Sequence, residues 1–376
     1  MTFSINKENK IIKDNQQQPD VHGGDIIGAS VRYNITQSQW IDLSTGLNPA
    51  GFPCANIPAS AFSQLPYLQP GFLKATAQYY GSSQFVPLIG SQMLIQALPK
   101  MLSKRPVLLP DVGYTEHRDS WCAAGFEMHN YPAFDLDKAT QSIDSALLEN
   151  SAQHLVVINP NNPSGLLIPP QMLLAWAAKL QPNCYLIVDE AFIDLTPQLS
   201  VLAHQWPANM LVLRSFGKFF GLAGIRIGFA FAQGELRAKI ERQLGLWMIN
   251  GPAQYLAEKA FKDLVWQSNA RAQIVADAHL TTQLFTPLLS FLEPTENTLQ
   301  VWVQQGLFSS YQMSLTTALE LQDQFCQDGI LLRVIALEQN VGTVAQGLLR
   351  IGLLSAINTE QQQRIRRCVA KITAVD

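Results

Sequence analysis

The sequence lacks several features that would point to particular classes of protein. Its five cysteines (Cys54, Cys122, Cys184, Cys326 and Cys368) are far apart and form no C-x-x-C pair, so neither a disulfide framework nor a metal site is expected. No apolar run reaches the roughly 18 residues that a membrane-spanning helix needs. The first residues, MTFSINKENK, do not form a signal peptide. We therefore expect a cytoplasmic protein with reduced thiols and no membrane partner.

Charge is also scarce, whereas apolar residues are abundant. A net charge of −3 and a pI near 6.1 give no electrostatic reason to expect a nucleic-acid partner. The 376 residues are 47% hydrophobic, which is enough for a large core and predicts two domains or one large domain with a satellite. Residues 1–20 are polar and rich in Lys, Asn and Gln, so they are expected to form a flexible arm.

The most informative stretch, LVLRSFGKFFGLAGIRIGFAFA, runs from Leu211 to Ala232. Two apolar runs flank a glycine-rich segment, which predicts a strand, a loop and a strand. The phenylalanines around Lys218 would desolvate its amine and lower its pKa, as a lysine that forms a Schiff base requires. Ser215 and Arg226 add a hydroxyl and a fixed cation, which suit a phosphate. A single lysine in such a loop is nevertheless more often a solvated surface residue.

Three strings carry a resemblance to a known family. SFGKFFGLAGIRIG closely resembles the pyridoxal-phosphate lysine segment of the aspartate aminotransferase superfamily of fold type I and, within it, of the threonine-phosphate decarboxylases of cobalamin biosynthesis. NPNNPSG (159–165) and VDEAF (188–192) carry the same resemblance, which covers nearly the whole chain from Val21 onward. It implies an α/β fold, in which a large domain has a mostly parallel sheet flanked by helices and a small domain is α+β. It also implies the cofactor pyridoxal 5'-phosphate on Lys218.

The resemblance also divides the chain. After the arm at 1–20, residues 21–50 are expected to contribute to the small domain and to the active-site cleft. Residues 51–284 are expected to form the large cofactor-binding domain, and residues 285–376 the small C-terminal domain.

Five residues are assigned to the phosphate of the cofactor. A Gly-Ser-Gln step opens a predicted helix at Ser91, where free N–H groups and the helix dipole favour an anion, although most helices begin with such residues. The resemblance assigns Ser91 and Gln92 to the phosphate, together with Ser215 and Arg226. Tyr67 stands at the place of a tyrosine that, in the superfamily, reaches across a dimer interface to the phosphate of the other subunit. A packing role for Tyr67 is the alternative.

Four further residues are expected around the ring of the cofactor. Asp189 ends a predicted strand, and a carboxylate facing a pyridine nitrogen keeps that nitrogen protonated, although an aspartate capping the next helix is common. By resemblance, Tyr114 stacks on the ring, His117 supports the aspartate and Asn162 binds the O3' atom. Phe192 stands where many aminotransferases have a tyrosine, and the decarboxylase branch resembles this chain there.

Four residues are assigned to the substrate. His22 belongs to an H-G-G segment similar to one near the active site of threonine-phosphate decarboxylases, and Gly46 lies in a loop expected to enter the cleft. Arg350 occupies the place of the arginine that binds the substrate carboxylate, and Arg333 that of an arginine used when the substrate bears a phosphate. Guanidinium groups pair with both anions in bidentate fashion. Solvated surface positions are the ordinary alternative for His22 and for both arginines.

The resemblance thus implies a homodimeric enzyme that decarboxylates L-threonine O-3-phosphate to aminopropanol phosphate for the cobalamin side arm. A histidinol-phosphate-type aminotransferase remains open, because the bond that breaks depends on which one stands perpendicular to the cofactor ring. Phe192 and the H-G-G segment argue against that alternative. A noncatalytic binding or regulatory protein that retains the fold also remains open, and the completeness of the cofactor site argues against it.

Overall fold

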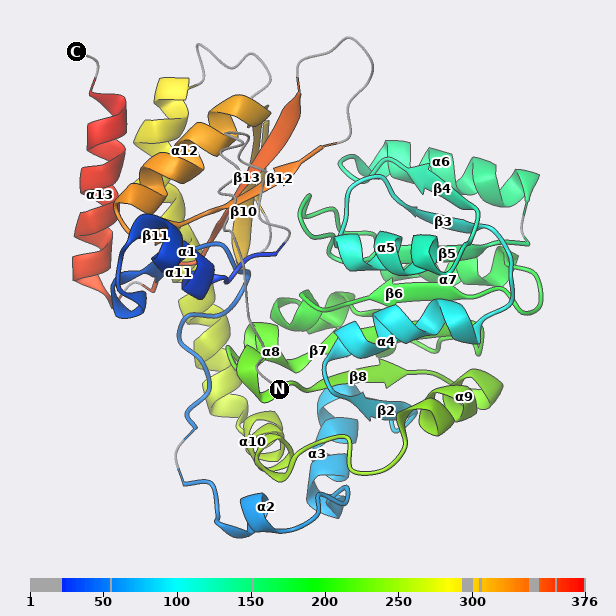
Figure 1. The fold of residues 1–376 in the computed structure, drawn as a ribbon. Helices are drawn as coiled ribbons and strands as arrows, with labels where there is room; N and C mark the ends of the chain where they lie inside the picture. The colour runs from blue at the N-terminus through cyan, green and yellow to red at the C-terminus, as the bar shows by residue number, and fades with distance from the viewer. Residues whose placement is uncertain are drawn as a thin grey trace, which may run out of the picture.

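A computed structural model describes residues 22–54, 56–150, 152–292, 300–303, 306–337, 345–355 and 357–374. The arm expected at 1–20 lies outside the described residues. A large body is built on a seven-stranded sheet, and a smaller body lies beside it at the upper left of Figure 1. Within the described part of the chain, no helix has the length and apolar character needed to cross a membrane.

The large sheet has the strand order β2-β8-β7-β6-β5-β3-β4. Every neighbouring pair is parallel except the two pairs that involve β8, which runs against both β2 and β7. The predicted fold class, an α/β protein with a mostly parallel central sheet, is therefore confirmed. The strands are β2 (Phe85–Leu88), β3 (Val107–Pro110), β4 (Met128–Tyr131), β5 (His154–Ile158), β6 (Leu186–Asp189), β7 (Met210–Ser215) and β8 (Gly228–Phe231).

Helices cover both faces of this sheet. Successive side chains of a strand point to opposite faces, so Leu155 and Val157 of β5 enter one core and Val156 enters the other. Both sets are buried, which explains why the strands are almost uniformly apolar. The first core is covered by α3 (Pro70–Tyr80), α6 (Leu136–Glu149), α7 (Pro170–Lys179) and α10 (Gly251–Lys262), and the second by α4 (Ser91–Ala97), α5 (Thr115–Ala123) and α9 (Gly234–Leu244).

The small body is an antiparallel sheet of order β12-β13-β10-β9 with helices against it. The N-terminal segment joins this body, because β1 pairs in parallel with β11 and Ile41 and Leu43 lie in its hydrophobic core. The elements are α1 (Ile26–Tyr33), β1 (Ile41–Asp42), β9 (Gln300–Val303), β10 (Phe308–Ser314), α12 (Leu315–Gln327), β11 (Ile330–Leu331), β12 (Arg333–Ala336), β13 (Gln346–Gly352) and α13 (Thr359–Thr373).

One long helix, α11 (Leu264–Leu292), connects the two bodies (Figure 1). Its first half packs in the core of the large body through Ala270 and Ile274, and its second half packs in the small body through Phe285 and Leu288. The boundary expected between residues 284 and 285 therefore falls inside a continuous helix. A helix can change the core that it faces while its backbone continues, and α11 continues even through Pro287.

Two segments depart from a simple alternation of strand and loop. The stretch Ile330–Ile335 is divided between β11 and β12, which belong to two different sheets and separate at Leu332. The segment after β7 was expected as a loop, yet it contains one helical turn, α8 (Phe216–Phe219), which carries Lys218. A short helix, α2 (Ser60–Ser63), completes the regular elements outside the 3-10 turns.

Candidate active site

The residues expected to carry the chemistry converge on one edge of the large sheet. Strands β5, β6 and β7 are parallel, so their carboxyl ends deliver Asn162, Asp189 and Lys218 to the same edge. Because β8 is antiparallel, its amino end brings Arg226 to this edge as well, and the carboxyl end of β2 brings Ser91. Residues beside the ends of five strands therefore meet where open α/β sheets bind ligands.

A cleft of about 170 Å³ lies at this edge, between the large sheet and the small body. Its lining contains seven of the residues proposed from the sequence for the cofactor or the substrate. The lining residues are His22, Gly23, Thr45, Gly46, Gly113, Tyr114, Thr115, Asn162, Pro163, Lys218, Arg333, Ile335 and Arg350.

Lys218 lies in this cleft on the single turn of α8. Its Nζ atom is 5.3 Å from the centre of the Phe192 ring. Desolvation, with the nearby cations of Arg350 and Arg226, lowers the pKa of Lys218 from 10.5 to about 8, while Asp189 acts in the opposite direction. A substantial fraction of this amine is consequently neutral, and nucleophilic, near neutral pH.

Asp189 is held in place by two contacts. The Nε2 atom of His117 lies 3.0 Å from its Oδ2 atom, and the backbone N–H of Ala191 donates to its Oδ1 atom over 3.1 Å. Both His117 and Asp189 are buried. A carboxylate can only accept, so the His117 Nε2 atom must carry the proton. The pair presents a fixed, hydrogen-bonded carboxylate at the sheet edge, as protonation of a cofactor nitrogen would require.

A cradle suited to a phosphate surrounds Gly228. Ser215 is the register partner of Gly228, and a side chain at Gly228 would place its Cβ 2.7 Å from the backbone nitrogen of Ser91. A Cβ at Gly90 would likewise lie 2.7 Å from Arg226 Nη2. Glycine at both positions therefore leaves an N–H group at the start of α4 and a guanidinium open to an anion.

Gln92 and Tyr114 adjoin this cradle and contact one another. The Tyr114 hydroxyl donates to Gln92 Oε1 over 2.8 Å. This bond ties the start of α4 to the start of α5, so the tyrosine ring is fixed at the cleft wall.

Two arginines face each other at the wall formed by the small body. Arg333 and Arg350 are register partners on β12 and β13. Arg350 is 7% exposed, and its guanidinium donates to Asn162 Oδ1 over 2.6 Å and to the Ser44 carbonyl. Burial, followed by the Arg333 cation, lowers the pKa of Arg350, whereas Asp42 raises it. Both hydrogen-bond acceptors of Arg350 are neutral groups, so an anion in the cleft would supply charge that the guanidinium lacks.

His22 lies at the mouth of the same cleft. Its Nε2 atom is 3.0 Å from Glu116 Oε1, and Gln96 donates to the other carboxylate oxygen over 3.1 Å. Glu116 was not identified from the sequence. An acidic residue in the first turn of a helix is common for reasons of the helix dipole, so only the fold reveals that it contacts His22.

Tyr67 is not in the cleft of its own chain. Its side chain is 60% exposed, packs edge-on against Trp247 with ring centres 5.9 Å apart, and lines a separate groove of about 630 Å³. Its expected contact with a cofactor therefore requires a second subunit.

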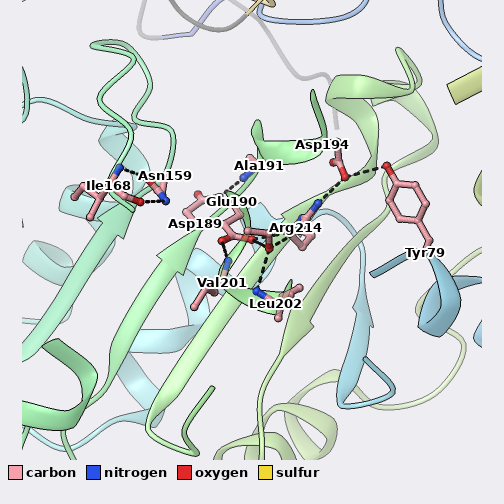
Figure 2. Close-up of polar contacts among 11 residues, drawn as sticks. Tyr79, Asn159, Ile168, Asp189, Glu190, Ala191, Asp194, Val201, Leu202 and Arg214 are labelled. Atoms are coloured by element: carbon pink, nitrogen blue, oxygen red, sulfur yellow. Dashed lines mark hydrogen bonds and ion pairs between the residues drawn. The ribbon is translucent and has the colours of Figure 1, made fainter. Parts of the chain in front are cut away.

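A buried charged network that the sequence did not reveal lies behind Asp189 (Figure 2). Arg214 lies between Glu190 and Asp194, with N to O distances of 3.2 and 2.6 Å, and Ser200 and Tyr79 donate to the two carboxylates. Glu190 follows Asp189 directly, and Arg214 directly precedes Ser215. The network thus fixes the strand ends that carry two site residues. The signal for this network in the sequence was a charged residue in or directly after each apolar strand, Arg214 in β7 and Glu190 after β6.

The comparisons agree with this geometry. The profile of the family "Aminotransferase class I and II" matches residues 55–368. A threonine-phosphate decarboxylase of Pseudomonas aeruginosa is 40% identical over 264 residues, which are 70% of this chain and 77% of that protein. One from Sinorhizobium sp. is 40% identical over 244 residues, 62% of this chain and 69% of the relative.

Among solved structures, histidinol-phosphate aminotransferase from Sinorhizobium meliloti, in complex with pyridoxal-5'-phosphate, superposes with a TM-score of 0.72 at 16% identity. The superposition covers 98% of this chain and 99% of that one, and it shows the shared fold. With a mostly parallel sheet and a family profile over most of its length, the chain belongs to the aminotransferase class I and II family.

Proposed function

We propose that the protein is a pyridoxal-phosphate-dependent carboxy-lyase that converts L-threonine O-3-phosphate to carbon dioxide and (R)-1-amino-2-propanol O-2-phosphate. The observation that carries this proposal is the pair Arg333 and Arg350, register partners in the same cleft as Lys218. Two guanidinium groups suit a substrate that has both a phosphate and a carboxylate. The relatives that are 40% identical and named threonine-phosphate decarboxylase support the same substrate.

The residues at the sheet edge fit the cofactor. The cradle kept open by Gly90 and Gly228 would hold its phosphate through Ser91, Gln92, Ser215 and Arg226. The remaining groups would contact its ring: Tyr114 against a face, Asn162 at the O3' atom, and Asp189, supported by His117, at the pyridine nitrogen. All of them lie at the edge to which Lys218 also belongs.

Pyridoxal phosphate, when bound, supplies an aldehyde that bonds an amine and a ring that accepts the electron pair of a bond breaking at the substrate Cα. Lys218 Nζ would hold that aldehyde. The carboxylate of Asp189 would favour positive charge at the ring nitrogen, because opposite charges favour both ionised forms. Each of these tasks belongs to a side chain whose position is fixed by the fold.

The arginines decide which bond is oriented for cleavage. Arg350 binds the carboxylate and Arg333 binds the phosphate, with His22 close to the phosphate at the cleft mouth. A substrate that is held at both ends would have its Cα–carboxylate bond fixed in a single orientation within the cleft. When carbon dioxide leaves, Lys218 Nζ would donate a proton to Cα, so that a C–H bond replaces the broken bond to the carboxylate. Gly46 lines this space, and a side chain there would meet Phe192 and Phe308 at 2.9 Å.

The decisive experiment incubates the cofactor-loaded protein with L-threonine O-3-phosphate, with and without 2-oxoglutarate, and measures carbon dioxide release. We expect release that does not depend on the keto acid. A parallel reaction contains histidinol phosphate and 2-oxoglutarate. Glutamate formed there, without carbon dioxide from the first substrate, would overturn the decarboxylase and establish the aminotransferase.

The rate of cofactor uptake should depend on pH in a defined direction. Because the Lys218 pKa is lowered to about 8, the amine loses its proton and becomes nucleophilic as pH rises through that value. Uptake of pyridoxal phosphate by the cofactor-free protein should increase between pH 7 and 9 and then level off, as followed by stopped-flow absorbance at about 25 °C. Nα-acetyl-lysine, which keeps a free side-chain amine, serves as the reference amine. A midpoint near the ordinary lysine value of 10.5 would refute the lowered pKa.

The same shift has a consequence for stability. Between about pH 8 and 10.5 the unfolded chain keeps a proton on this lysine that the folded chain has released. The unfolded state thus binds more protons, and the free energy of unfolding rises with pH across this window.

We also propose that the protein is a homodimer. Phe62, Leu65, Tyr67, Leu246 and Trp247 are large apolar side chains that are exposed near one another around two neighbouring grooves or on the adjoining helix α2. Exposed apolar patches of this kind mark protein interfaces. A second copy on this surface would bring Tyr67 to the other subunit's cofactor phosphate. We further propose that the protein acts in cobalamin biosynthesis and that it is located in the cytoplasm.

Sedimentation measures the dimer directly. We expect a mass of twice the 41.7 kDa chain, and Trp247→Glu should shift it toward one chain because a carboxylate would be buried at the interface. Leu148→Glu is the matched control, since Leu148 is 89% exposed on α6. A wild-type protein that sediments as a single chain at micromolar concentration would exclude the dimer.

A further inference from the structure

The segment from Ser44 to Phe52 leaves the small body and passes along the cleft to the turn that carries Lys218. Asn48, in the middle of this segment, is 4% exposed. Its functional group is an amide with no charge and no place in the chemistry described above. Its contacts, however, are concentrated on the lysine turn.

The turn α8 needs partners for its carbonyl groups. A helix leaves its last four C=O groups without partners inside the helix, and α8 has only four residues. The backbone N–H of Asn48 donates to the Lys218 carbonyl over 3.0 Å, and its side-chain Nδ2 donates to the Phe219 carbonyl over 3.0 Å. The Phe52 N–H donates to the Phe220 carbonyl over 2.9 Å. The segment thus binds three successive carbonyls at the end of the turn.

The orientation of the Asn48 amide is fixed. Its Oδ1 atom accepts the backbone N–H of Ala50 over 2.9 Å, so the opposite end of the amide, Nδ2, is directed to Phe219. The two backbones also touch. A Cβ at Gly221, whose φ is +64°, would lie 2.5 Å from the Asn48 carbonyl oxygen, and one at Gly51 would lie 3.0 Å from the Gly221 oxygen. Glycine at both positions permits this close approach.

The other end of the segment contacts the substrate side of the cleft. Arg350 donates to the Ser44 carbonyl, and the next two residues, Thr45 and Gly46, line the cleft. One short segment therefore connects the arginine proposed for the substrate carboxylate to the turn that carries the lysine, with only three residues between Ser44 and Asn48.

We propose that Asn48 is a positioning residue for Lys218: by binding the Lys218 and Phe219 carbonyls it fixes the turn, and with it the direction in which the lysine amine enters the cleft. The assignment of Lys218 as the reactive amine rests on the proposed function. The hydrogen bonds by which Asn48 fixes the turn do not depend on that function. Accordingly, the test begins with the cofactor-free protein.

The test compares Asn48→Asp with Asn209→Asp. Asn209 also donates its Nδ2 to a backbone carbonyl, that of Ala177 over 2.8 Å, but it lies at the amino end of β7, away from the cleft. In each variant the lost N–H leaves a carboxylate against a carbonyl oxygen. Hydrogen exchange of the peptide 216–221 should become at least about tenfold faster in Asn48→Asp, from loss of a hydrogen bond to a buried carbonyl, and should not change in Asn209→Asp.

Acylation of Lys218 provides a second readout. Acetic anhydride is applied across a pH series, and the modified peptide is quantified by mass spectrometry. The wild-type midpoint reflects burial and the charges of Arg350, Arg226 and Asp189 around the amine. A loosened turn would solvate the amine, and the added carboxylate would also favour its charged form, so the midpoint in Asn48→Asp should move upward toward 10.5. Gly51→Ala adds no charge, so an upward shift in that variant reports the loosening of the turn. In the loaded enzyme we expect kcat to fall by at least about tenfold with KM nearly unchanged.

A second variant keeps the proposal open to refutation if Asn48→Asp does not fold. Gly51→Ala leaves the Asn48 amide intact but places a Cβ against the Gly221 and Phe220 carbonyls, so it should change both readouts in the same direction and by less. The proposal would be overturned if the Asn48 and Gly51 variants showed the same exchange rate and acylation midpoint as the wild type. It would also be overturned if Asn209→Asp changed these two quantities as much as Asn48→Asp does. If the turn loosens as expected but L-threonine O-3-phosphate is not decarboxylated, the inference stands and the proposed substrate falls.

Discussion

Replacing Lys218 with alanine is expected to remove the covalent attachment of pyridoxal phosphate and to lower the rate of carbon dioxide release by at least about 10³-fold. Lys218 supplies both the amine that bonds the cofactor and the proton that returns to Cα. Its Nζ lies close to the Phe192 ring in the cleft that also contains Arg350. No neighbouring lysine lines that cleft among the residues that the structure describes, so no other amine can take its place.

The measurement has two parts, which separate attachment of the cofactor from catalysis. Borohydride reduction followed by peptide mass spectrometry locates the bound cofactor, and carbon dioxide release gives the rate. Lys179→Ala is the control, because Lys179, at the end of α7, makes an exposed ion pair with Asp144 of α6 and does not line the cleft. Cofactor found on another lysine, or activity retained in Lys218→Ala, would contradict the assignment of Lys218 as the reactive amine.

Replacing Arg350 with methionine is expected to reduce kcat/KM for L-threonine O-3-phosphate by about 10²- to 10³-fold, which corresponds to a loss of roughly 3 to 4 kcal/mol of transition-state binding. The guanidinium is buried and bonded only to neutral acceptors on Asn162 and Ser44. A substrate anion would give it a directly bonded charge partner, whereas Asp42 acts on it without a hydrogen bond among the described residues. In Arg350→Met the substrate carboxylate would lose the guanidinium that is proposed to bind it in a buried site.

Arg350→Lys tests the geometry separately from the charge. An ammonium keeps the charge but cannot offer a planar fork, so we expect a partial loss that is smaller than in Arg350→Met. Arg364→Met is the matched control in the small body, since Arg364 also donates to a backbone carbonyl, that of Gln39. Cofactor binding is titrated in parallel. Equal kinetic losses in Arg350→Met and Arg364→Met would mean that Arg350 acts through the stability of the small body.

The sequence alone determined those parts of the protein in which local pattern and chemistry coincide. Apolar runs that end in polar residues located β5, β6 and β7, because a strand buried on both faces is apolar at every position. The same runs located Asn162, Asp189 and Lys218, because a parallel sheet delivers the residues after its strands to one edge. The resemblance then assigned a task to each of them, and the family that it implied is confirmed.

Tertiary structure alone decided which distant residues meet. The split of Ile330–Ile335 between two sheets, the change of core along α11 and the contact of His22 with Glu116 each depend on segments far apart in the sequence. The buried group of Arg214, Glu190 and Asp194 and the hold of Asn48 on the lysine turn are of the same kind. Periodicity reports which face of an element is buried, but the partner that covers that face is selected by the packing of the whole chain.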